Sequence, residues 1–184
     1  MTTLTGRDKS ALLVIDVQNG VVEGAYNLES VVSNINLAVK KARAAGIPVV
    51  WVQHSDEELV LESDRWQIVP ELAPLDGEPK VRKLYRSSFE ATDLESILAG
   101  LNVGHIYVTG MQTDNCVRHT THAAQERGYD ITVLADAHST TGYEWEGHVV
   151  DAKAVVDQFN DNFYGSELPG RFTRAILTKD LSFS

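Results

Sequence analysis

Short apolar runs recur along the chain and alternate with longer segments whose apolar residues have helical spacing. The first run, ALLVIDV at residues 11–17, is typical of a strand that helices cover on both faces. Further strand-like runs lie at residues 47–52, 81–85, 105–108, 129–135 and 172–177. This alternation predicts an α/β fold, a three-layer α/β/α sandwich with a mostly parallel, doubly wound central sheet and right-handed crossovers.

The segments between the runs predict the helices and loops of that sandwich. From Asn27, an N-cap residue type, to Gly46, apolar residues recur at helical spacing, and Pro48 follows as a stop. Shorter helices are expected at residues 93–99, 116–127 and 146–160, and a polar loop at 136–143. Residues 54–78 have no regular pattern, and so long a connection is usually a functional loop.

Length, charge and cysteine usage restrict the class of protein. The chain has 184 residues, which suits a single domain over residues 1–184. Its formal net charge of −10 disfavours nucleic acid and anionic membranes as partners, and no apolar run is long enough to span a bilayer. The polar start and the single cysteine, which cannot form an internal disulfide, predict a cytoplasmic protein.

Three reactive side chains lie at or near the ends of predicted strands: Asp16, Lys83 and Cys116. Gly110 ends the run that precedes Cys116, and Thr113-Asp114-Asn115 favours the start of a helix. Cys116 is therefore expected in a first helical turn, where unpaired N–H groups and the helix dipole favour a thiolate. Because the C-terminal ends of parallel strands meet at one edge of the sheet, the three side chains are expected to converge there.

These three residue types suit nucleophilic catalysis. A carboxylate can take the thiol proton, an ammonium group can hold the thiolate, and the sulfur can attack a carbonyl carbon. Spacing alone supports a second interpretation equally well, a buried Asp–Lys ion pair beside an inert cysteine.

The residues around these positions resemble a known family. VIDVQNG, KVRKLYRSSFEATDLESIL and VTGMQTDNCVRHTTHAAQERGYDITVLADAHST are similar to the isochorismatase-like cysteine hydrolases, which include nicotinamidases, N-carbamoylsarcosine amidases and ureidoacrylate hydrolases. The resemblance implies a catalytic triad of Asp16, Lys83 and Cys116. It also implies an oxyanion hole from the backbone N–H groups of Gln112 and Cys116, with a cis peptide between Met111 and Gln112.

The chain departs from the nicotinamidase pattern at its metal ligands. After the second predicted strand it reads VQHSDEEL, with His54 and Asp56 but no second histidine nearby. Two ligands are too few for a metal site, so no metal is expected. No other cofactor is expected either, since no glycine-rich phosphate loop follows the first strand. The expected substrate pocket contains Asn19, His54, Trp66 and Tyr143.

The sequence thus predicts a cysteine hydrolase that cleaves a C–N bond of a small amide, carbamoyl or ureido compound through a thioester. The expected partners are this small-molecule substrate and further copies of the chain, as a homo-oligomer of two or more subunits. Alternatives are an isochorismatase-type vinyl ether hydrolase, a non-catalytic binding protein on the same fold, and a redox sensor. A Cys116–His119 dyad competes with Asp16 as the base, and His119 with His122 could instead form a metal-ligand pair.

Overall fold

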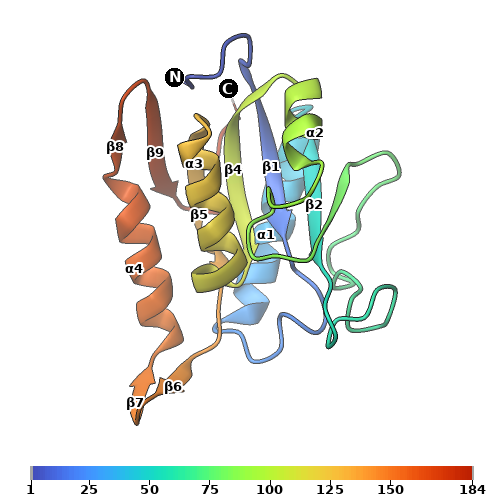
Figure 1. Ribbon diagram of the computed structural model, residues 1–184, viewed down its shortest axis with the longest axis vertical. Coiled ribbons are helices and arrows are strands. Elements are labelled where there is room, and N and C mark those ends of the chain that lie inside the picture. Colours follow the sequence, from blue (N-terminus) through green and yellow to red (C-terminus); the bar gives the residue numbers. More distant parts are fainter. Residues whose placement is uncertain (1, 184) are drawn as a thin grey trace.

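A computed structural model describes residues 2–183 and has one large sheet at its centre (Figure 1). Its strands follow the order β3-β2-β1-β4-β5-β9-β8. The strands are β1 (Lys9–Ile15), β2 (Val49–His54), β3 (Lys80–Lys83), β4 (Val103–Met111), β5 (Asp130–Ser139), β8 (Glu167–Leu168) and β9 (Arg171–Ile176). All neighbours pair in parallel except β8, which is antiparallel to β9. The predicted parallel sheet is confirmed.

Helices cover both faces of this sheet. Helix α1 (Leu28–Ala44) lies behind the sheet in Figure 1, whereas α2 (Leu94–Gly100), α3 (Arg118–Glu126) and α4 (Ala152–Tyr164) lie in front. Strand β1 contributes side chains to the hydrophobic core on both faces of the sheet. Leu12 and Val14 pack towards α1, while Leu13 and Ile15 pack towards the other helices. This two-sided burial explains why the run is continuously apolar. None of the helices described is long and apolar enough to cross a membrane.

The structure corrects one predicted helix. Residues 146–150, expected in a helix from Glu146, instead belong to a two-stranded hairpin of β6 (Tyr143–Trp145) and β7 (His148–Val150). Glu146 and Gly147 both have positive φ, at 49° and 79°, which is the backbone of a tight hairpin turn. Helix α4 begins only at Ala152, where the Asp151 carboxylate caps it by accepting a hydrogen bond from the Ala154 N–H.

Two strands run further than their apolar residues suggested. Strand β4 continues through Gly110 to Met111, and β5 continues through residues expected in a polar loop to Ser139. Gly110 has a φ of 124°, and a Cβ atom there would lie 2.0 Å from the backbone oxygen of Ile15. The close approach of β4 to β1 at this point therefore requires glycine.

The substitution Gly110→Ala is expected to destabilise the protein by about 3 kcal/mol or more, since it combines a strained φ with a clash against backbone. Gly46→Ala is the matched control, because Gly46 also has a positive φ of 69° but has open space around it. It should cost about 1 kcal/mol. Denaturant unfolding of both variants measures the difference, and equal losses would contradict the packing argument.

Candidate active site

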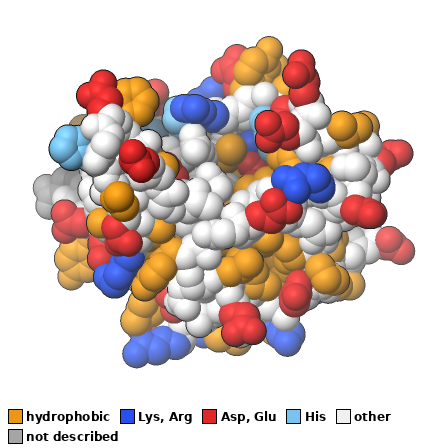
Figure 2. Space-filling view, turned by 90° about the horizontal axis from the view of Figure 1, so that it is seen from below, with side chains coloured by type: hydrophobic (Ala, Val, Ile, Leu, Met, Phe, Trp, Pro, Cys, Tyr) orange, Lys and Arg blue, Asp and Glu red, His pale blue; other side chains and the backbone are white. Residues whose placement is uncertain are grey.

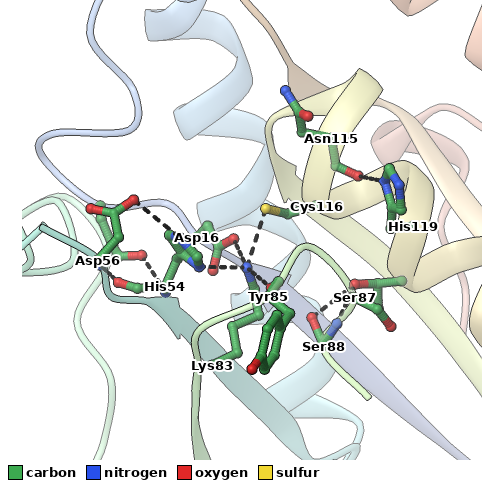
Figure 3. Close-up of polar contacts among 12 residues, drawn as sticks. Asp16, His54, Asp56, Lys83, Tyr85, Ser87, Ser88, Asn115, Cys116 and His119 are labelled. Atoms are coloured by element: carbon green, nitrogen blue, oxygen red, sulfur yellow. Dashed lines mark hydrogen bonds and ion pairs between the residues drawn. The ribbon is translucent and has the colours of Figure 1, made fainter. Parts of the chain in front are cut away.

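Asp16, Lys83 and Cys116 converge at the C-terminal edge of the sheet, as predicted. Asp16 follows β1, Lys83 ends β3, and Cys116 lies in a π-helical turn (η1, Thr113–Val117) between β4 and α3. The Lys83 ammonium lies 2.6 Å from the Asp16 carboxylate and 3.1 Å from the Cys116 sulfur (Figure 3). Figure 2 looks onto this edge of the molecule from below, and acidic and basic side chains are interspersed over it.

Lys83 is the centre of this cluster. Its side chain is buried, and its ammonium group also donates to the Tyr85 carbonyl at 3.2 Å and lies 3.4 Å from Nδ1 of His54. The sheet order explains why Lys83, Asp16 and His54 lie together, since β2 lies between β3 and β1 and ends with His54 at the same edge. A lysine this buried is stable as a cation only because anionic and polar groups surround it.

The charges of the cluster shift its titration. Burial alone would lower the pKa of Lys83, but the neighbouring charges of Asp16 and Cys116 outweigh it and raise that pKa. Burial raises the pKa of Asp16 despite the opposing charge of Lys83. Burial and the charge of Asp16 together raise the pKa of the Cys116 thiol to about 12, against the opposing effect of Lys83.

The raised pKa of Cys116 corrects the expectation that a helix N-terminus favours a thiolate. Cys116 precedes α3 in a tight turn whose middle residue, Asn115, is non-helical at φ −114° and ψ −105°. Burial and the Asp16 carboxylate therefore favour the thiol over the thiolate, against the effect expected of a helix N-terminus.

The turn before Cys116 is held from behind by buried polar side chains. The peptide bond between Met111 and Gln112 is cis, as the resemblance implied. The Gln112 carbonyl accepts the N–H groups of Asn115 and Val117 at 3.0 and 3.2 Å. His138 of β5 is buried, and its two ring nitrogens lie 2.9 Å from Thr113 Oγ1 and from Asn160 Oδ1.

Sequence reasoning missed both His138 and Gln18 as positioning residues. The buried Gln18 amide donates to the carbonyls of His54 and Trp66 and accepts the His54 N–H, so it ties the end of β1 to the end of β2. Its place beside Asp16 in VIDVQNG was the available signal. For His138 the only signal was an isolated histidine in a segment that looked like a polar loop.

A cavity of about 380 Å³ opens onto the thiol. Its walls come from the segment after β1, the end of β2, the segment after β3 and the turn before α3. The lining residues are Asp16, Gly20, Val21, Glu23, His54, Asp56, Arg86, Gln112, Asn115 and Cys116. A space of this size accommodates a small organic molecule whose reacting carbon lies against the sulfur.

Of the predicted pocket residues, the structure brings only His54 into this cavity. Asn19 donates to the Asp64 carbonyl, and Trp66 is buried in the loop between β2 and β3 with the Arg82 guanidinium over its ring. Tyr143 lies on the β6–β7 hairpin and is 48% exposed. Asn19, Trp66 and Tyr143 do not line this cavity, and their role in binding substrate stays a prediction.

The two histidines of α3 also take no part in the cluster. Nδ1 of His119 lies 2.9 Å from the Asn115 carbonyl, and Figure 3 shows the imidazole on the opposite side of the turn from Lys83. The His122 ring packs against Phe163. Within residues 2–183, no group of three or more histidine, cysteine or carboxylate side chains is arranged to hold a metal ion. His54 instead pairs with Asp56, at 3.2 Å.

Comparison with known proteins agrees with this architecture. Residues 10–161 match the family model of the isochorismatase domain. A secreted isochorismatase effector of Verticillium dahliae is 33% identical over 135 residues, which are 70% of this chain and 71% of that protein.

Solved structures share the fold. An isochorismatase of Pseudomonas putida KT2440 superposes with a TM-score of 0.85 at 24% identity, covering 94% of this chain and 90% of its own. The N-carbamoylsarcosine amidase of Thermoplasma acidophilum superposes with a TM-score of 0.73 at 24% identity, covering 94% and 98%. Together with the match to the family model, these similarities show that the chain belongs to the isochorismatase family of hydrolases.

Proposed function

We propose that this protein is a metal-independent cysteine hydrolase that cleaves a C–N bond of a small amide, carbamoyl or ureido compound. The observation that carries the proposal is the contact of the Lys83 ammonium with both the Cys116 sulfur, at 3.1 Å, and the Asp16 carboxylate, at 2.6 Å. An acid–base group and a candidate nucleophile thus line one cavity, and a fixed cation contacts both of them.

The first half of the reaction forms a thioester. Asp16 takes the thiol proton as the Cys116 sulfur attacks the substrate carbonyl carbon, and the raised pKa of Asp16 makes it a better base for this step. The backbone N–H groups of Gln112 and Cys116 would stabilise the oxyanion. The C–N bond then breaks, and the leaving amine takes its proton from Asp16.

The second half restores the enzyme. Asp16, again a carboxylate, takes a proton from water as the water oxygen attacks the thioester carbon. The C–S bond breaks, the acid product leaves, and the proton returns from Asp16 to the sulfur. Lys83 keeps its proton throughout, because its pKa is raised by the neighbouring anions. Its positive charge stabilises the thiolate whenever the sulfur carries negative charge.

The substitution Cys116→Ala should abolish turnover, by at least about 10³-fold, with the fold retained. Cys116→Ser should be nearly as inactive, since the Asp16 carboxylate cannot readily deprotonate a hydroxyl of much higher pKa. Both variants and the wild type are assayed for turnover of a panel of small amide, carbamoyl and ureido compounds, with intact-mass detection of an acyl group on Cys116. Vinyl ether cleavage would leave no such adduct, and activity in the alanine variant would remove the covalent mechanism.

Removal of the Lys83 charge should make the thiol harder to ionise, because Lys83 is the group that lowers the pKa of Cys116. Lys83→Met keeps a long side chain, and alkylation of Cys116 by iodoacetamide at pH 8 should slow by about tenfold or more. Arg82→Ala is the control, because the Arg82 guanidinium lies over the Trp66 ring. Equal alkylation rates in the wild type, Lys83→Met and Arg82→Ala would mean that Lys83 is only a structural partner of Asp16.

Activity is expected to survive exhaustive chelation, because His54 and Asp56 are too few ligands for a catalytic metal site. The measurement is turnover before and after dialysis against a chelator, together with metal analysis of the purified protein. A stoichiometric metal that is lost together with activity would overturn this part of the proposal.

A further inference from the structure

The acidic side chains that line the cavity all have partners. Asp16 pairs with Lys83 at 2.6 Å, and Glu23 pairs with Arg65 at 2.6 Å. The Asp56 carboxylate accepts the N–H groups of Glu58 and Leu59, at 2.8 and 2.7 Å, and contacts the His54 imidazole. These contacts lower the pKa of Asp56 and hold its charge at the rim.

Arg86 differs from these groups. It lies three residues beyond Lys83, in the segment between β3 and α2, and lines the same cavity as the thiol. Its guanidinium is exposed, and no hydrogen bond or ion pair joins it to any residue from 2 to 183. The nearby Arg82 and Arg65, by contrast, are engaged by the Trp66 ring and by Glu23. Arg86 thus presents an unpaired cation with five N–H donors to the cavity.

A second unpaired donor lies in the turn η1 that holds Cys116. Asn115 lines the cavity, and its side-chain amide makes no hydrogen bond within the described residues; Figure 3 shows this amide extending away from His119. The donors of Arg86 and Asn115 therefore come from the two segments that flank the thiol. Such donors suit a ligand with negatively charged oxygen atoms.

We propose that Arg86 is a specificity residue that binds an anionic group, in the first place a carboxylate, carried by the substrate beside its scissile carbonyl. This rests on the proposed function and narrows its substrate class to N-carbamoyl amino acids and amides of dicarboxylic acids. The net charge of −10 repels anions at long range, so a substrate of this class needs a local cation in the cavity. Neutral amides would gain less from Arg86, because they offer it no negatively charged acceptor.

The single cysteine of the chain allows a test that needs no turnover. Iodoacetate and iodoacetamide alkylate a thiol by the same displacement and differ by one negative charge. Their rate ratio cancels any change in the thiol pKa and reports the attraction of the cavity for an anion. N-(iodoacetyl)glycine and N-(iodoacetyl)glycinamide form a second pair that places the carboxylate further from the sulfur. Both ratios are measured at low salt in wild type, Arg86→Gln, Arg86→Lys and Arg82→Gln.

Arg86→Gln should lower the anion-to-neutral ratio of at least one pair by roughly five- to tenfold, and Arg86→Lys should retain most of it. Arg82→Gln removes the same net charge outside the cavity and should leave both ratios within about twofold. Unchanged ratios in Arg86→Gln, or equal losses in Arg82→Gln, would overturn the proposal. Neither outcome bears on hydrolysis, whereas absence of an acyl-enzyme with every compound would count against the proposed function alone.

Discussion

The ion pair between Asp16 and Lys83 places two opposite charges in a part of the protein that water hardly reaches, with both side chains at most 1% exposed. Removing such groups from water costs several kcal/mol per ion, so neither charge is tolerable there without the other. The pair joins the end of β1 to the end of β3 across β2, and Gln18 and His54 fill the space at the end of β2. The geometry around Cys116 depends on this pair, since the sulfur contacts the same ammonium group.

The same burial sets the chemistry of the thiol. Burial disfavours a thiolate, and a thiolate would also add a second negative charge beside Asp16, so the pKa of Cys116 is raised and not lowered. In the proposed mechanism, proton transfer to Asp16 would remove that conflict, because the negative charge would pass from oxygen to sulfur while Lys83 contacts both groups. Under the proposed function, the resting site would keep the sulfur protonated until a carbonyl carbon is present to take the developing charge.

The strands and the meeting of Asp16, Lys83 and Cys116 could be predicted because both follow from strong local signals. Continuous apolar runs mark strands buried on two faces, and the C-terminal ends of parallel strands share an edge, so these three side chains were expected to converge. The residues 143–150 lacked such a signal: Val149 matched a helical period with its neighbours, but it lies on a hairpin and is 82% exposed. The pocket residues were missed because the segment between β2 and β3 has no period from which side-chain directions follow, and Trp66 turns into its own loop.

The residues proposed to react lie at or near the ends of strands, whereas the residues proposed to select the substrate lie on loops. The groups proposed to break bonds, Asp16 and Lys83, are buried and fixed by strands, so their contacts leave little freedom for change. Arg86 and Asp56 stand on loops at the rim of the cavity, where a substitution disturbs few packing contacts. If the proposed function holds, the rim would meet the parts of a substrate away from the scissile bond, and their charge could be selected there without altering the proton transfers at Asp16 and Cys116.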